Sequence, residues 1–171
     1  MMQQLHDYQP VTTNLCLRQV LVEQWKMSHE ELPISGGWGY TKEDCIIIHK
    51  KESSSRSIFS NGIVNLEYLI AEKRIFAELI TLRSREEMYC DMSRRLIKQE
   101  TIKSDGRWYD HLIFRVDALK YDDFMMLSTE FAKRKKVIHF AYEAFEQKMN
   151  QLKYCYEPEY WFDITEGYGQ H

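Results

Sequence analysis

The chain has 171 residues, the length of one ordinary domain, and 44% of them are hydrophobic, which is enough for a sizeable core. It contains 23 Lys and Arg residues and 26 Asp and Glu residues, so its net charge is -3, which argues against nucleic acid as the default partner. The first residues lack a secretory signal pattern, and no stretch reaches the roughly 18 apolar residues of a membrane span. We therefore expect one cytoplasmic domain over residues 1–171, with no membrane partner.

The first expected element is a helix. Apolar residues recur at three- and four-residue spacing from Thr13 to Glu31, and Thr12 or Thr13 is available as its N-cap. Pro33 ends the pattern because proline disfavours helix at the residue before it. We expect about 11 residues ahead of this helix to be frayed.

A cluster of glycines and aromatics follows, which we call the glycine–aromatic loop (residues 36–40). One hypothesis is a loop that closes over a small molecule, because glycine-rich backbone offers N–H groups and aromatic rings stack on flat groups. The other is a structural turn that lets Trp38 reach the core. The spacing matches neither a P-loop nor a dinucleotide fingerprint. The candidate ligand-binding residues are Gly36, Gly37, Trp38, Gly39, Tyr40, Asp44, His49 and His111.

After the loop, the segment 45–50 is short and rich in isoleucine, which predicts a buried strand. The polar residues 51–57 predict a loop, and Ile58 and Phe59 favour the start of another short strand. Asn61 and Gly62 form a typical turn dipeptide.

From residue 63 to about 102 a helical stripe of apolar residues alternates with a polar face that includes Glu67, Arg74 and Glu78. An unbroken helix of this length would reach roughly 60 Å, which is too long for the domain. We therefore expect a kink or short break near residues 81–85.

Residues 104–106 predict a turn, and residues 109–117 alternate between apolar and mixed positions, as a strand does. Residues 122–152 carry a near seven-residue apolar repeat, which predicts a long helix that could break at its basic run. The aromatic-rich tail, residues 154–171, is expected to dock onto the rest of the chain.

The cysteines lie far apart, at positions 16, 45, 90 and 155, without any C-x2-C pair. This spacing predicts reduced thiols and no metal site, and no motif indicates a cofactor. The basic run from Lys133 to Lys136 is more typical of a solvated helix surface than of a nucleic-acid patch.

These elements predict an α+β fold in which a small, mostly antiparallel sheet packs with long amphipathic helices; a mostly α fold is the alternative. Because no catalytic signature is present, the first functional hypothesis is a non-enzymatic protein that binds a protein partner or itself, as a homodimer. The alternatives are a small-molecule-binding protein or enzyme with a site under the glycine–aromatic loop, and a nucleic-acid-associated protein that uses the run from Lys133 to Lys136.

Overall fold

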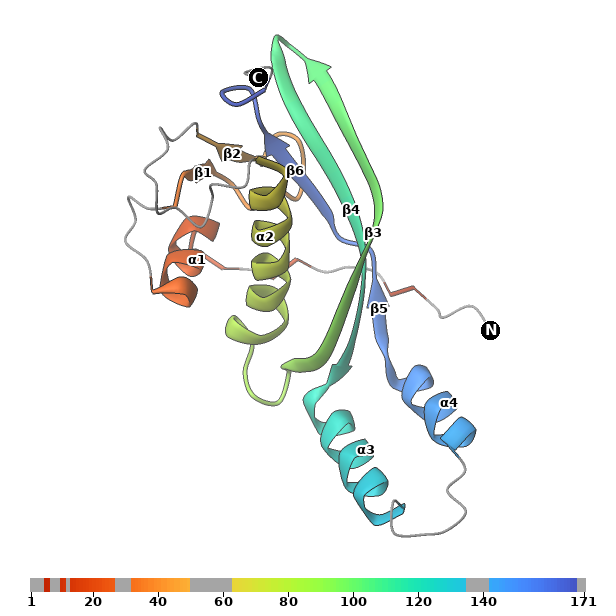
Figure 1. Cartoon of the computed structure of the whole chain (residues 1–171). Coiled ribbons are helices and arrows are strands. Elements are labelled where there is room, and N and C mark those ends of the chain that lie inside the picture. Colours follow the sequence, from red (N-terminus) through yellow and green to blue (C-terminus); the bar gives the residue numbers. More distant parts are fainter. Residues whose placement is uncertain are drawn as a thin grey trace.

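The chain adopts an α+β fold in a computed structural model that describes residues 5–6, 10–11, 13–26, 32–49, 63–134 and 142–168 (Figure 1). Six strands of the described residues form one sheet, and helices lie on one of its faces and at one of its ends. In chain order the elements are α1 (Leu17–Trp25), β1 (Ile34–Gly36), β2 (Ile46–Ile48), α2 (Ile63–Phe76), the π-helical turn η1 (Ala77–Thr81), β3 (Tyr89–Ser104), β4 (Arg107–Lys120), α3 (Tyr121–Arg134), α4 (Tyr142–Leu152), β5 (Tyr154–Tyr156) and β6 (Glu159–Asp163).

The strands are ordered β1-β2-β6-β4-β3, and β5 pairs with β4 beyond the end of β6. Only the β2–β6 pair is parallel among the strands that the structure describes. Strands β3 and β4 form a long hairpin closed by Asp105 and Gly106, whose φ angles of 54° and 77° suit a tight two-residue turn. The turn expected at residues 104–106 is confirmed.

The core lies between the sheet and the helices α1 and α2. Alternate residues of β4, namely Leu112, Phe114 and Val116, face this core, as their spacing in the sequence predicts. Leu66 and Ile70 of α2 belong to the same cluster. Burial of one sheet face against α2 therefore accounts for the best strand prediction in the chain.

The helix expected over residues 63–102 is wrong in its second half. It ends in η1, close to the break expected at residues 81–85, and the chain then continues as β3. Strand β3 is the edge strand of the sheet and is mostly exposed, so it lacks the buried alternate positions that mark a strand. Two irregularities in its pairing, one beside Asp91 with a φ of 48°, disturb the alternation further.

The N-terminal helix is shorter than expected. Helix α1 begins after Cys16, which serves as its N-cap in place of Thr13, and it closes at Lys26 in the left-handed conformation. The Cys16 N–H donates to the side chain of Gln19, as in a capping box. The expected end of this helix at Glu31 lies outside the described residues.

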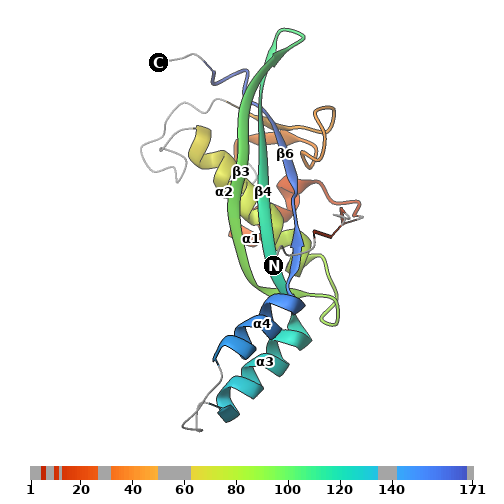
Figure 2. The ribbon, with the colours of Figure 1, turned by 90° about the vertical axis from the view of Figure 1, so that its right-hand side faces the viewer.

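The segment expected to be helical over residues 122–152 contains two helices, α3 and α4, and α3 ends at Arg134, within the basic run at which a break was considered. Both project from the end of the sheet opposite the Asp105–Gly106 turn, and both views show them side by side (Figures 1 and 2). We call this pair the α3–α4 arm. The segment between the two helices, which includes Lys136, lies outside the described residues, as do the turn and strand expected within residues 51–62.

The aromatic segment after residue 154 forms β5 and β6, and β6 lies between β2 and β4. In the part of the chain that the structure describes, no helix combines the length and the apolar character that crossing a membrane requires.

Candidate functional site

The glycine–aromatic loop leads from β1 toward β2 and is held by backbone hydrogen bonds. The Gly37 N–H donates to the Cys45 carbonyl (3.0 Å), and the Gly39 N–H donates to the Asp44 carbonyl (2.6 Å). The Trp38 N–H donates to Asp44 Oδ2 (3.0 Å). Three successive amides that could have bound a ligand are therefore used within the protein.

The glycines of this loop meet steric demands of the turn. Gly36 and Gly39 have φ angles of 84° and 75°, which favour glycine. A Cβ atom on Gly37 would lie 1.8 Å from Asp44 Oδ1, so a side chain there would displace the carboxylate. Close backbone approach to Asp44 explains this glycine.

Trp38 points toward the protein and packs against the core, half-buried. Its indole Nε1–H donates to the Leu15 carbonyl (3.0 Å), and its ring lies parallel to that of Tyr40 at 6.1 Å between centroids. The Tyr40 hydroxyl donates to Glu78 Oε1 (2.8 Å). These contacts agree with the hypothesis of a structural turn.

Arg74 connects this loop to helix α2 and strand β6 through hydrogen bonds. Its side chain is fully buried between the rings of Tyr40 and Tyr160, with its guanidinium carbon 4.2 and 4.1 Å from their centroids. It donates to Glu78 Oε1 (2.8 Å) and to the carbonyls of Trp38 (2.9 Å) and Gly39 (3.3 Å). A further bond reaches the Glu159 carbonyl (3.0 Å) on β6.

The polar face expected on helix α2 is therefore partly wrong. Glu67, Arg74 and Glu78 are buried, because Arg74 and Glu78 pair inside the core and Glu67 faces the sheet near Asp110. Burial raises the pKa of Glu67 from 4.5 to about 9, and the negative charge of Asp110 adds to the effect. Glu67 is thus a neutral acid at pH 7.

His49 lies just after β2 and joins two other side chains. Its Nε2 lies 2.6 Å from the Ser35 hydroxyl on β1, and its Nδ1 lies 3.0 Å from Glu166 Oε1 in the turn after β6. The His49 side chain is 41% exposed, so solvent reaches this group. The sequence indicated His49 as a candidate residue but carried no signal for its contacts with Ser35 and Glu166.

His111 forms a separate group on β4, two strands away from β2. Its Nδ1 lies 3.1 Å from Glu100 and its Nε2 lies 2.9 Å from Glu159, while its ring stacks on Trp161 at 4.0 Å. Carboxylates accept hydrogen bonds, so both contacts form together only when both ring nitrogens carry a proton. A hydrogen bond from Lys98 and then the one from His111 lower the pKa of Glu100.

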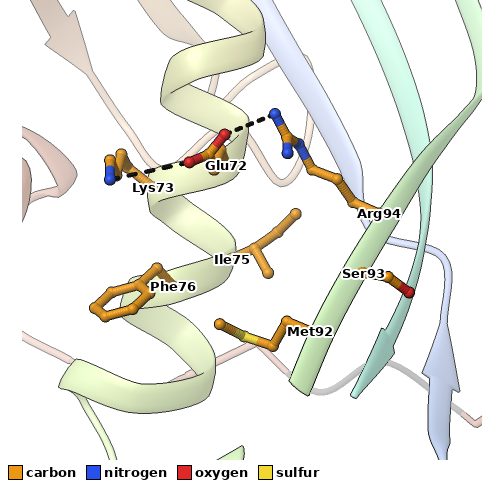
Figure 3. Close-up of a pocket in the computed structure, with 7 residues that line it drawn as sticks. All are labelled: Glu72, Lys73, Ile75, Phe76, Met92, Ser93 and Arg94. Atoms are coloured by element: carbon orange, nitrogen blue, oxygen red, sulfur yellow. Dashed lines mark ion pairs between the residues drawn. The ribbon is translucent and has the colours of Figure 1, made fainter. Parts of the chain in front are cut away.

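A shallow hollow of about 180 Å³ lies between α2 and β3 (Figure 3). Ile75, Phe76 and Met92 provide its apolar surface, and an ion pair of 2.7 Å between Glu72 and Arg94 spans its upper side. None of the ligand-binding residues expected from the sequence lines this hollow.

The structure brings the expected residues into three places. Residues 36–40 and Asp44 form one turn, His49 contacts Ser35 from the end of β2 that is farther from this turn, and His111 lies apart on β4. Of the basic run, Lys133 is described and is exposed near the free end of the arm. No group of three His, Cys, Asp or Glu side chains suited to a metal ion occurs within the described ranges.

The fold and these groups define an α+β protein with one mixed sheet, a buried arginine between two tyrosine rings, and two histidine clusters. No model of a known family, no curated protein and no solved structure matches the chain.

Proposed function

We propose that the protein works through protein–protein contact, as a homodimer in which the α3–α4 arms of two copies pack together. The arm projects beyond the sheet (Figure 2), and the observation that carries this proposal is the number of large apolar side chains that it exposes.

The arm exposes large apolar side chains on both helices. Met125, Met126 and Phe131 on α3 are 46%, 44% and 37% exposed, and Tyr142 on α4 is 56% exposed. Four of the ten large hydrophobic side chains that are exposed among the described residues lie on this arm, and exposed apolar surface concentrated in one part of a protein marks an interaction surface more often than isolated residues do. Methionine and aromatic residues are also enriched where proteins bind each other.

Contacts within one copy leave most of the arm uncovered. The rings of Phe131 and Phe145 meet at 5.5 Å, and Lys148 pairs with Glu130. Leu127 is the one buried residue of α3, and α4 has none, among the residues with described burial. A two-helix hairpin with so little core is stabilised when a second hairpin completes a four-helix bundle.

Charge favours a second copy in antiparallel orientation. Asp122 and Asp123 lie where α3 leaves the sheet, whereas Lys133 lies near the free end of the arm, and the sequence stays basic to Lys136. Two arms that pack antiparallel about a twofold axis place the basic end of each beside the acidic start of the other.

Sedimentation velocity over a concentration series tests this proposal. The wild type is expected to approach twice the 20.6 kDa chain mass as concentration rises, whereas Met125→Glu/Met126→Glu is expected to stay monomeric. The matched control is Val64→Glu/Ile97→Glu, which places the same charges on two exposed apolar residues outside the arm and should leave the dimer intact. A monomeric wild type at high micromolar concentration, or equal loss in both variants, would reject the proposal.

A further inference from the structure

Ser35, His49 and Glu166 form a hydrogen-bonded chain in which each imidazole nitrogen meets a different side chain. The Ser35 hydroxyl lies 2.6 Å from His49 Nε2, and Glu166 Oε1 lies 3.0 Å from His49 Nδ1. A hydroxyl, an imidazole and a carboxylate in this order are the parts of an activated serine nucleophile. We propose that these three residues form an acyl-transfer site that cleaves small, uncharged carboxylic esters.

The β1–β2 hairpin places the serine and the histidine on the same face of the sheet. Ser35 pairs with Ile47, and the His49 N–H donates to the Pro33 carbonyl (2.8 Å), so the two side chains are two pairing positions apart. Side chains at such positions project from the same face because strands alternate with a period of two. Ile34, Ile46 and Ile48 occupy the other face, which belongs to the core.

Strand β6 brings the carboxylate to the histidine. It runs parallel to β2, with Ile47 opposite Asp163, and the turn that follows carries Glu166. The Gly167 N–H closes this turn on the Ile164 carbonyl (3.0 Å). Three segments separated in the sequence are thus held together by regular backbone hydrogen bonds.

The carboxylate determines which nitrogen of His49 carries the proton when the imidazole is neutral. An ionised carboxylate only accepts hydrogen bonds, so Nδ1 carries hydrogen toward Glu166 and Nε2 accepts from the Ser35 hydroxyl. This tautomer is the one that a general base acting on the serine requires. Glu166 is therefore a positioning residue, and Ser35 and His49 are the catalytic residues.

A donor for the oxyanion lies next to the nucleophile. In an antiparallel pair of strands, every second pair of opposite residues exchanges backbone hydrogen bonds. Gly37 donates to Cys45 and His49 donates to Pro33, so the pair halfway between them, Ser35 and Ile47, is also hydrogen-bonded, and the Gly36–Ile46 pair is not. The Gly36 N–H therefore points away from β2, toward the edge of the sheet. An amide that directly follows a nucleophilic serine can bind the oxygen that gains negative charge.

The reaction follows from these positions. His49 Nε2 takes the proton of the Ser35 hydroxyl while its oxygen attacks the ester carbonyl carbon, and Gly36 stabilises the tetrahedral oxyanion. The C–O bond to the alcohol breaks as His49 returns the proton to that alcohol, which leaves an acyl-serine. Water then repeats the sequence, releases the carboxylic acid and regenerates Ser35. No oxidant or cofactor is needed.

Exposure and charge indicate the substrate class. The side chains of His49 and Glu166 are 41% and 52% exposed, so the group lies at an open surface that suits a small acyl chain. The Glu166 carboxylate disfavours anionic substrates. An ester suits the site better than an amide, because an alkoxide is a better leaving group than an amide anion.

The first test uses a fluorophosphonate probe, with the labelled residue located by mass spectrometry, and hydrolysis of 4-nitrophenyl acetate. Ser35 is expected to be labelled. Ser35→Ala should lose the label and reduce hydrolysis to the buffer rate, and His49→Gln should reduce hydrolysis about 100-fold. Glu166→Gln should reduce it at least about tenfold and change the pH profile, because the histidine tautomer is no longer held. Ser84→Ala is the matched control, since Ser84 is exposed and contacts Glu87 but no histidine.

A second variant separates catalysis from a purely structural role. Ser35→Cys, made in a Cys16→Ser background to remove the exposed thiol, should react with iodoacetamide at least about tenfold faster than the same protein with His49→Gln, because the imidazole takes the thiol proton. Equal alkylation rates, or hydrolysis that Ser35→Ala leaves unchanged, would overturn the proposal. The site lies on the sheet and not on the arm, so its failure would not affect the proposed dimer, nor the reverse.

Discussion

Replacing Arg74 with methionine should destabilise the fold severely, because Arg74 is the partner of a carboxylate that is 1% exposed. Methionine has a similar length but cannot donate hydrogen bonds, so Glu78 and the carbonyls of Trp38, Gly39 and Glu159 would each lose a donor. Removing one partner of a buried ion pair costs about 3 to 5 kcal/mol.

That loss is a large share of the stability of a domain, which is about 5 to 15 kcal/mol. Arg74→Met should therefore remain folded in buffer, with a melting temperature about 8 to 16 °C lower for a loss of about 4 kcal/mol. Equilibrium unfolding in urea, followed by tryptophan fluorescence, measures the free energy of unfolding directly. Trp38 reports on the affected loop because its carbonyl binds Arg74.

The double variant Arg74→Met/Glu78→Met provides the control that isolates the ion pair. Removing both charges takes away the unpaired carboxylate, so the double variant should be more stable than Arg74→Met alone. A loss below about 1 kcal/mol for Arg74→Met, or additive effects of the two substitutions, would refute the reasoning that Arg74 neutralises a buried charge.

Three further predictions concern Glu67, the cysteines and Gly37. The pKa of Glu67 is raised from 4.5 in the unfolded chain to about 9, so the folded state binds more protons between these values and its stability should fall as pH rises through this window. Glu67→Gln should flatten the plot of unfolding free energy, measured in urea, against pH. An unchanged slope of that plot would contradict the raised pKa of Glu67. The Cys16 thiol is exposed, whereas burial and, to a smaller extent, the neighbouring Asp117 raise the pKa of Cys155 to about 11. A thiol reagent at pH 8 should therefore modify Cys16 well before Cys155. Comparable modification rates of the two thiols would be inconsistent with the burial of Cys155. Gly37→Ala should lower the melting temperature by several degrees because its Cβ has no space, and an unchanged melting curve would refute the close packing of this loop.

In the long hairpin, the sequence predicted the strand that has a buried face and missed the strand that is mostly exposed. Strand β4 alternates between core and outer positions, so Leu112 and Phe114 mark it clearly. Strand β3 lies at the edge of the sheet, and its charged residues, such as Arg95 and Lys98, are good helix formers. Because packing with β4 determines its conformation, local preference gave the wrong answer there.

The candidate site could be predicted only in part for a similar reason. Ser35 and His49 approach each other through the register of a short hairpin, but Glu166 arrives from the turn after β6, 117 residues beyond His49. Sequence spacing carries no signal for such a contact. In the sequence, Arg74 also looked like a surface residue of a helix. It is buried because hydrogen-bond acceptors from three separate segments of the chain meet around it.

Arg74 also connects the loop to the proposed acyl-transfer site. It binds the carbonyls of Trp38 and Gly39, just after Ser35 in the chain, and the carbonyl of Glu159 at the start of β6, the strand that leads to Glu166. The Trp161 N–H of β6 donates in turn to the Gly39 carbonyl (3.0 Å). One buried cation thus holds the loop against the strand that leads to the turn carrying the positioning carboxylate. Apart from the Gly36 N–H, the glycine–aromatic loop contributes to such a site through the placement of its neighbours, since the amides of residues 37–39 and the rings of Trp38 and Tyr40 are engaged in the fold.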